Sequence, residues 1–239
     1  MPRFLIVTAA PAERDAIVRG LPSDRQPAAG IIAGYDIART MTAAGLIDVI
    51  VAGVGPVAAA VATAAVLTHG YDLVFSAGIA GGFSPIEAGE LVVASAVVQA
   101  DLGAETADGF RSMADLGWGE VRFELDGTIS GVLAHRARAE TGEVLSVSTV
   151  TGTQRRADEL RERHPDAKAE AMEGIGVYAA ARSHGAAFAE VRAISNSVGP
   201  RDRDNWHIEQ ALERLGAGFD SMLAAPLKLP VRVTASPSQ

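Results

Sequence analysis

The chain has 239 residues, with 21 lysines and arginines against 29 aspartates and glutamates, which gives a net charge of −8 at neutral pH. This acidic balance, without a basic cluster, argues against nucleic-acid binding and against a polybasic membrane anchor. The absence of cysteine excludes thiol catalysis, disulfide scaffolds and cysteine-based zinc sites. The length and the 48% hydrophobic content are typical of a globular protein with its own core.

Strand and helix patterns alternate along the chain. The runs that predict strands are Arg3–Thr8, Ile31–Thr40, Ile47–Ala52, Leu73–Ala77, Glu90–Gln99, Glu143–Val150 and Phe188–Ser195. The patterns that predict helices are Ala12–Gly20, Val57–His69, Thr153–Arg163, Glu173–Ser183 and Asp204–Leu223. Continuous apolar runs within the strands predict a sheet covered on both faces, and therefore a layered α/β fold. We expect one domain over residues 1–225 and a C-terminal tail at 226–239.

Three segments need separate interpretation. Gly103–Asp126 is rich in small and acidic residues and is predicted to be a surface loop or lid. Val49–Leu67 is uncharged over 19 positions, but Gly53–Pro56 interrupts it and most of the rest is alanine. We therefore expect a strand, a glycine turn and a helix there, with no membrane span. The N-terminal apolar stretch reaches Glu13 too early to complete a signal peptide, so we expect a cytoplasmic protein.

The segment Gly53–Ala58 matches the G-x-G-x-x-A fingerprint of dinucleotide-binding proteins, between a predicted strand and a predicted helix. That fingerprint also requires an acidic residue at the end of the next strand, and Asp72 instead precedes that strand. Pro56 removes a backbone N–H from the turn that would hold the phosphates. A plain strand-to-helix turn is the favoured interpretation, and NAD binding is the alternative.

Other patterns with a known chemistry are missing from the sequence. The five histidines are scattered without metal-ligand spacing, and no serine nucleophile elbow, P-loop or EF-hand pattern occurs. We therefore expect no metal and no cofactor.

Polar residues at strand ends are the remaining candidates for a site. Glu13 follows the first strand, Ser76–Gly82 is a glycine-rich loop after a strand, and Met172–Glu173 and Ser195–Asn196 lie at two further junctions. Open α/β sheets bind ligands at the carboxyl ends of their strands, which makes these positions candidates. From the residues alone, Glu13 can equally be a carboxylate that stabilises a helix N-terminus.

Together, these segments resemble the nucleoside phosphorylase/nucleosidase superfamily and, within it, the futalosine hydrolases. The matching segments are Glu13 with the strand before it, Val51–Pro56, Ser76–Gly82, Ala171–Gly174 and Arg192–Asp202. The resemblance implies a single α/β domain with a central mixed sheet, partly closed like a barrel and flanked by helices. It also implies a homo-oligomer, a dimer or larger, that binds a small purine nucleoside.

The resemblance further implies roles for individual residues. Glu13 would be the general base that activates water, and Glu173 would accept hydrogen bonds from the ribose hydroxyls. Met172 would pack against the apolar face of the sugar. Further residues expected in the substrate site are Gly78, Ile79, Thr149, Val150 and Trp206.

Two departures from the relatives bear on the reaction. Adenine-specific nucleosidases of the superfamily carry an aspartic acid where this chain has Asn196, and an amide can donate a hydrogen bond to purine N7 but cannot transfer a proton. Asn196 therefore favours a 6-oxopurine such as hypoxanthine, although an amide can also pair with adenine. Phosphorylases of this fold hold phosphate with an arginine where Ser76 stands, so water is the expected nucleophile.

The resulting prediction is the hydrolysis of futalosine to hypoxanthine and dehypoxanthinyl futalosine, a step in an alternative menaquinone pathway. The alternatives are another purine nucleosidase, a purine nucleoside phosphorylase, or a purine-binding module without catalysis. Arg201 and Arg203 are candidates to hold the 5′ substituent, or they are partners in structural ion pairs.

Overall fold

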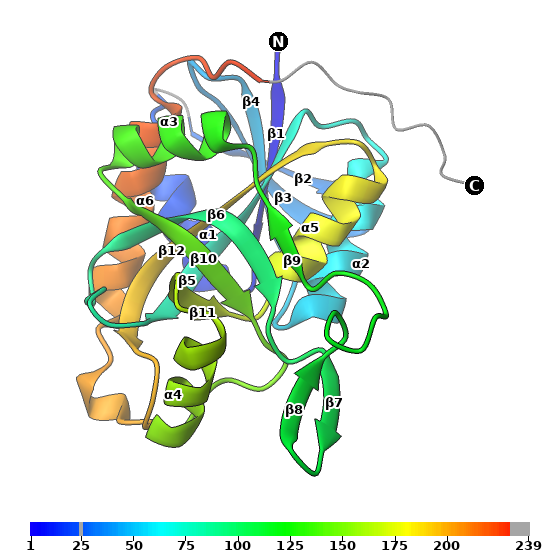
Figure 1. The fold of residues 1–239 in the computed structure, drawn as a ribbon. Coiled ribbons are helices and arrows are strands. Elements are labelled where there is room, and N and C mark those ends of the chain that lie inside the picture. Colours follow the sequence, from blue (N-terminus) through cyan, green and yellow to red (C-terminus); the bar gives the residue numbers. More distant parts are fainter. Residues whose placement is uncertain (24–25, 230–239) are drawn as a thin grey trace.

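The computed structural model describes residues 1–23 and 26–229 (Figure 1). Its helices are α1 (Pro11–Gly20), α2 (Pro56–Leu67), α3 (Gly127–Ala137), α4 (Gln154–Arg163), α5 (Gly174–Ser183) and α6 (Ile208–Leu223), with a short 3-10 turn at Arg203–Asn205. Its strands are β1 (Arg3–Thr8), β2 (Ala28–Ile32), β3 (Tyr35–Met41), β4 (Leu46–Val51), β5 (Leu73–Gly82), β6 (Leu91–Gln99), β7 (Gly103–Thr106), β8 (Gly109–Ser112), β9 (Arg122–Glu124), β10 (Glu140–Ser146), β11 (Ala167–Ala171) and β12 (Ala187–Ser197). Most of the expected tail at 226–239 lies outside the described residues.

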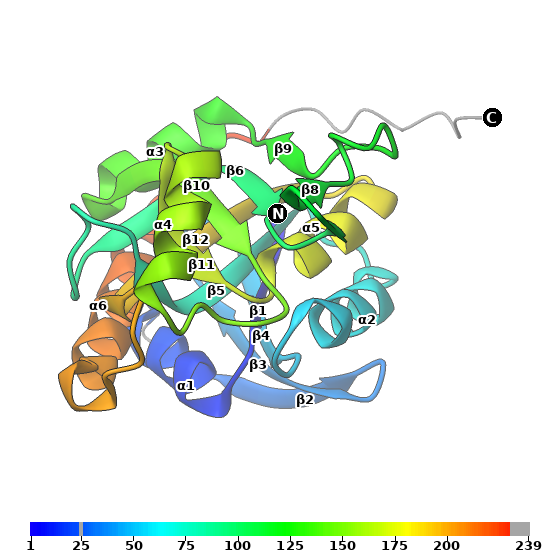
Figure 2. The ribbon, with the colours of Figure 1, turned by 60° about the horizontal axis from the view of Figure 1, so that its bottom comes forward.

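A mixed sheet forms the centre of the molecule. Its strand order is β11-β10-β6-β12-β5-β1-β4-β3-β2, and β9 pairs with β6. Strand β11 also pairs with β5, so β5, β12, β6, β10 and β11 close into a ring. Strands β1, β4, β3 and β2 continue from β5 as an open edge (Figure 2). The predicted α/β fold with a partly closed central sheet is therefore confirmed.

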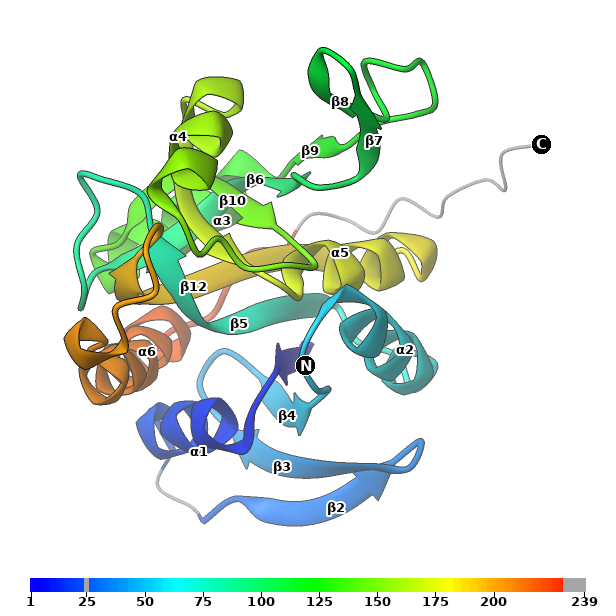
Figure 3. The same ribbon diagram turned by 90° about the horizontal axis from the view of Figure 1, so that it is seen from below.

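Helices cover the sheet on two sides (Figure 3). On one side α1, α3 and α6 bury an apolar cluster with β1, β5 and β12, which includes Ile17, Leu133 and Phe219. On the other side α2 and α5 bury a second cluster, which includes Val66 and Val177. Both faces of the central strands are therefore covered, so the place left for a ligand is the end of the sheet where β1, β5, β11 and β12 terminate.

The prediction of one continuous strand over Ile31–Thr40 is wrong. The structure has two strands there, β2 and β3, because the chain reverses direction between them. Ala33 and Gly34 adopt positive φ angles of 51° and 85°, which suits a tight hairpin turn. Strands β2 and β3 pair in antiparallel register on either side of this turn.

The predicted glycine-rich loop at Ser76–Gly82 is also wrong, because it forms the second half of β5. Its backbone pairs with β12 as far as Gly82, and Gly81 and Gly82 also pair with β11. The glycines therefore continue the ladder without side chains of their own, which leaves room for Glu13 beside Gly78 and for Asn196 and Val198 beside Gly81.

The structure contains elements within and beside Gly103–Asp126 that the pattern did not indicate. The hairpin β7–β8 projects from the body of the molecule, and β9 joins the central sheet (Figure 1). Helix α3 begins immediately afterwards, where the Asp126 side chain accepts hydrogen bonds from the backbone N–H groups of Thr128 and Ile129. The helix predicted over Asp204–Leu223 is present as α6, but it begins at Ile208.

Within the described part of the chain, no helix has the length and apolar character needed to cross a membrane.

Candidate active site

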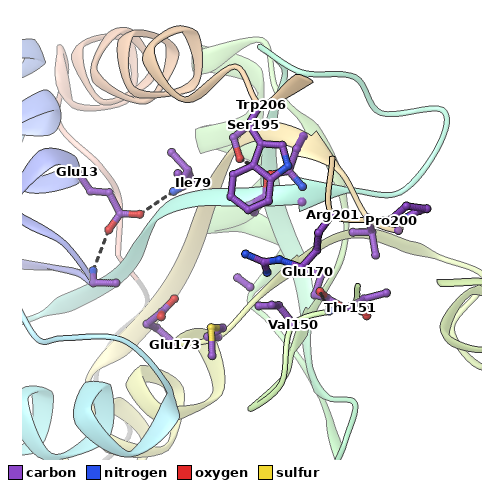
Figure 4. A pocket seen from close by; sticks show the side chains of 18 residues that line it. Glu13, Ile79, Val150, Thr151, Glu170, Glu173, Ser195, Pro200, Arg201 and Trp206 are labelled. Atoms are coloured by element: carbon purple, nitrogen blue, oxygen red, sulfur yellow. Dashed lines mark hydrogen bonds between the residues drawn. The ribbon is translucent and has the colours of Figure 1, made fainter. Parts of the chain in front are cut away.

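A pocket lies where several strands of the ring end (Figure 4). Its walls come from the segment after β1, the end of β5, the segment after β10, the β11–α5 junction and the segment after β12. The lining residues are Ala9, Glu13, Ile79, Ala80, Gly81, Val150, Thr151, Glu170, Ala171, Met172, Glu173, Ser195, Asn196, Val198, Gly199, Pro200, Arg201 and Trp206. In Figure 4, Glu13 and Glu173 lie toward one end of the view, and Thr151, Glu170 and Pro200 toward the other.

Three backbone N–H groups hold the buried carboxylate of Glu13. Its Oε2 accepts from Ala9 at 2.9 Å and from Ala10 at 3.0 Å, and its Oε1 accepts from Ile79 at 2.9 Å. Gly78 lies directly beneath, and a Cβ there would collide with the carboxylate and with Arg192. Burial raises the pKa of Glu13, although the N–H of Ile79 and the charge of Arg192 oppose this change. A carboxylate with a raised pKa, fixed beside a pocket, is suited to accept a proton.

Arg192 links the carboxylates around this end of the pocket. Its Nε donates to Glu190 at 2.9 Å, its Nη2 donates to the Ser76 hydroxyl at 2.7 Å, and its Nη1 lies 3.5 Å from Glu173 Oε2. Burial raises the pKa of Glu190, and Arg192 opposes this change. A fully buried guanidinium bonded on several sides keeps its position, so Arg192 fixes the carboxylates that surround it.

Glu173 stands at the junction between β11 and α5. Its Oε1 accepts from the backbone N–H of Gly55 at 3.1 Å, and Gly55 has a φ of 93°, which glycine adopts readily. The glycine turn before α2 therefore holds Glu173 and leaves acceptor positions of its carboxylate open to the pocket. This contact gives Gly53–Ala58 a role as a strand-to-helix turn, as the sequence favoured.

The end of β12 presents an oriented amide. The Ser195 hydroxyl donates to Asn196 Oδ1 at 2.7 Å, and Asn196 Nδ2 donates to the carbonyl of Ser197 at 3.0 Å. Since the amide oxygen already accepts a hydrogen bond and Nδ2 carries two protons, one N–H of Asn196 is available for a ligand.

Glu170 lines the pocket near the segment that follows β10. Its side chain accepts two hydrogen bonds from Thr151, one from the backbone N–H at 2.8 Å and one from the hydroxyl at 2.5 Å. Burial raises the pKa of Glu170, and the two Thr151 donors and Arg156 oppose this change.

Trp206 and two arginines form the outer rim. The guanidinium carbons of Arg201 and Arg203 lie 5.1 and 5.5 Å from the Trp206 ring centroid. Cation–π contact of this kind orders exposed side chains modestly, by about 0.5–1 kcal/mol. Arg201 lines the pocket itself, so its charge is available to a bound ligand.

The structure brings together most of the residues singled out in the sequence. Those that line the pocket are Glu13, Ile79, Val150, Met172, Glu173, Asn196 and Trp206. Gly78 lies buried behind Glu13 and does not line the pocket. Thr149 is exposed and also lies outside the lining, because the hydrogen bonds to Glu170 draw Thr151 into the wall in its place.

Sequence reasoning assigned no role to four of these groups, namely Thr151, Glu170, Glu190 and Arg192. A signal for Glu170 was available, since it is a charged residue at the end of an alanine-rich strand that leads directly into Met172–Glu173. In the described residues, no three or more His, Asp or Glu side chains are grouped so that they could hold a metal ion.

Comparison with known proteins identifies relatives over nearly the whole chain. The family model of the Phosphorylase superfamily matches residues 3–224. Futalosine hydrolase of Streptomyces coelicolor is 48% identical over 223 residues, which cover 89% of this chain and 91% of the relative. Futalosine hydrolase of Acidothermus cellulolyticus is 44% identical over 227 residues, which cover 92% and 90%.

Solved structures share the fold at much lower identity. A futalosine hydrolase of Helicobacter pylori superposes with a TM-score of 0.79 at 18% identity, over 92% of this chain and 97% of that one. An S-adenosylhomocysteine nucleosidase of Streptococcus pyogenes gives a TM-score of 0.81 at 19% identity, over 93% and 96%. Family match, sequence identity and fold agree: the chain belongs to the phosphorylase superfamily and, within it, to the futalosine hydrolase family.

Proposed function

We propose that this protein hydrolyses the N-glycosidic bond of futalosine and releases hypoxanthine and dehypoxanthinyl futalosine, a step of menaquinone biosynthesis. The single observation that supports the reaction type most is the pairing, in one pocket, of two buried carboxylates with an oriented amide donor. The identity of 44–48% to two futalosine hydrolases supports the choice of substrate.

The carboxylates suit the charge that develops on the sugar. Breaking an N-glycosidic bond builds positive charge on the ribose ring, so Glu13 and Glu173 stabilise the transition state more than the ground state. Glu173 accepts hydrogen bonds from the ribose 2′- and 3′-hydroxyls, and Met172 packs on the sugar. Glu13 takes a proton from the water that attacks the anomeric carbon.

The opposite charge develops on the departing purine. As the glycosidic electron pair moves to the base, N7 and O6 become stronger acceptors, and the available N–H of Asn196 donates to them. An amide stabilises this charge without transferring its own proton, which is sufficient for a base whose anion is already moderately stable. Val150, Ile79 and Trp206 enclose the substrate on its apolar sides.

Hydrolysis is favoured over phosphorolysis by the arrangement of the arginines. Arg192 is engaged with Glu190, Ser76 and Glu173. Arg201 is the single arginine among the described residues that line the pocket, and it belongs to the rim near Trp206. No second candidate function has an observation in its favour.

The proposal is tested by measuring which free base the purified protein releases from futalosine, inosine and methylthioadenosine. We expect hypoxanthine from futalosine at a kcat/KM at least about tenfold above that for inosine, and little adenine from methylthioadenosine. Release of adenine as the faster reaction would assign the protein to another nucleosidase specificity. Purine binding without release from any of the three would leave a non-catalytic binding module.

The proposal includes a cytoplasmic homo-oligomer. The association of chains is supported by an exposed apolar stripe on and before α2, where Val54, Val57 and Val61 are 65%, 75% and 59% exposed. Light scattering after size exclusion measures the assembled mass, and a mass of one chain at micromolar concentration would contradict it.

A further inference from the structure

Glu170 is a buried carboxylate of the pocket that the mechanism above does not use. It is 7% exposed and lies in Figure 4 with Thr151, on the side of the pocket away from Glu13. The backbone N–H and the hydroxyl of Thr151 each bind a different oxygen of this carboxylate, at 2.8 and 2.5 Å. Two donors from one residue fix the plane of the carboxylate, and each oxygen keeps one further acceptor position.

The strand register places Glu170 opposite Asn196 across a glycine. Glu170 on β11 pairs with Gly81 on β5, and Gly81 pairs with Asn196 on β12. Residues paired in this way present their side chains to the same face of a sheet. With adjacent strands about 4.8 Å apart, the backbones of Glu170 and Asn196 stand roughly 10 Å from each other.

Gly81 lies between these two residues in the sheet and lines the pocket with them. A Cβ on Gly81 would come within 2.9 Å of Val198 Cγ2 and 3.5 Å of Asn196 Nδ2. The absent side chain therefore leaves room for Val198 and Asn196 to pack against this part of β5. We call the part of the pocket beside Gly81 the slot, and it has the amide donor of Asn196 on one side and the carboxylate acceptor of Glu170 on the other.

The chemistry of this slot distinguishes two classes of purine. A 6-oxopurine presents the acceptors N7 and O6 along one edge, followed by the donor N1–H. A 6-aminopurine presents an unprotonated N1 at the same place, whose lone pair would face the lone pairs of the Glu170 carboxylate. An acceptor facing an acceptor in a buried site leaves both without a hydrogen bond, which is costly.

We propose that Glu170 accepts a hydrogen bond from N1–H of the base and thereby makes the pocket selective for 6-oxopurines over 6-aminopurines. Thr151 is the positioning residue that aims the carboxylate, and Asn196 contacts the N7/O6 edge of the same base. This inference rests on the proposed function in one respect, namely that the pocket binds the purine of a nucleoside.

The test compares the wild type with Glu170→Gln on inosine and adenosine, which share one sugar. A hydrogen bond to a charged partner corresponds to about one to two decades in kcat/KM, so the inosine value is expected to fall by roughly 10- to 100-fold. The adenosine value should stay or rise, because the glutamine amide can turn its N–H toward N1 of adenine. The readout is the ratio of the two values, which general damage to the fold would leave unchanged.

Two further variants complete the design. Glu143→Gln is the matched control, because Glu143 is a buried carboxylate that accepts from Arg122 and does not line the pocket. It should leave the inosine-to-adenosine ratio unchanged. Thr151→Val removes one of the two donors to Glu170 and should lower the ratio by a smaller factor than Glu170→Gln. It also provides the test should Glu170→Gln fail to fold.

Binding of the free bases separates this inference from the proposed function. Calorimetry with hypoxanthine and adenine needs no turnover, and the wild type should prefer hypoxanthine by at least tenfold, a preference that Glu170→Gln loses. If the wild type cleaves futalosine while Glu170→Gln keeps the full preference, the inference is wrong and the proposed function stands. If the wild type cleaves no nucleoside but discriminates between the bases through Glu170, the proposed function is wrong and the inference stands. An equal change for both bases would overturn the role of Glu170.

Discussion

At the scale of single residues, a carboxylate can be buried in a site only where hydrogen-bond donors offset the cost of removing its charge from water. Glu13 receives three backbone N–H groups and the field of Arg192, so it keeps its place although burial raises its pKa. Its position after β1 was evident from the sequence. The donor from Ile79, which comes from a strand 66 residues away, was not.

We expect Glu13→Gln to retain the fold and lose most of its turnover. The amide cannot take a proton from water, and general-base catalysis contributes about 10²- to 10⁴-fold to the rate. Initial rates of hypoxanthine release, with circular dichroism to establish folding, check this expectation. A folded variant with more than about a tenth of the wild-type rate would remove Glu13 from the reaction.

The pH dependence of the wild type follows from the same carboxylate. The base must be ionised, and its pKa is raised above the ordinary value of 4.5, so kcat/KM should be constant near neutral pH and fall on acidification. The apparent pKa of that fall should lie above 4.5. A profile that stays level down to pH 4.5 would show that no carboxylate with a raised pKa is needed.

Asn196 is the residue that we propose donates to the N7/O6 edge of the base. In Asn196→Asp, an ionised carboxylate would repel O6 and N7, so activity on inosine should fall by about 10²-fold near neutral pH, as when one preorganised donor is lost. At lower pH the protonated acid can donate, and activity on adenosine should rise relative to inosine. Paired pH–rate profiles measure this, and wild-type behaviour on both substrates would exclude contact between Asn196 and the base.

At the scale of elements, the sequence predicted the helices and strands that have a clear local pattern of apolar residues. It missed the strands that form only because they pair with distant segments of the chain. Strand β1 and helix α1 were evident, because their apolar residues repeat locally. The second half of β5 reads as a loop in isolation, since Gly78, Gly81 and Gly82 have low strand propensity. Pairing with β12 and β11 overrides that preference. The slot between Glu170 and Asn196 depends on this pairing and could not be predicted.

Helices α2 and α5 pack closely against each other, and this packing can be tested at Gly176. A Cβ on Gly176 of α5 would lie 2.9 Å from the Pro56 carbonyl carbon and 3.1 Å from the Ala60 nitrogen of α2. Gly176→Ala should therefore lower the free energy of unfolding by about 1–3 kcal/mol through overpacking. Gly131→Ala in α3 is the control, because nothing lies within 4 Å of its Cβ and alanine should stabilise that helix by up to about 1 kcal/mol. Urea denaturation compares them, and equal effects would contradict the close packing of α2 on α5.

At the scale of the whole molecule, the ring of β5, β12, β6, β10 and β11 gathers residues from both halves of the chain into one pocket. Glu13 comes from the first turn of α1, Glu170 and Glu173 from the β11–α5 junction, and Asn196 from β12. The resemblance to a known family implied this fold in advance. Alternation of strands and helices alone indicated only a layered α/β protein, because periodicity does not reveal that β11 returns to β5.

The most direct test of the central claim is the identity of the sugar product formed from futalosine with and without added phosphate. Mass spectrometry distinguishes a free ribosyl product from a ribosyl 1-phosphate. We predict the same rate of hypoxanthine release in both conditions and dehypoxanthinyl futalosine with a free anomeric hydroxyl as the product. Release that depends on phosphate, with a 1-phosphate as the product, would contradict hydrolysis and assign this pocket to a phosphorylase.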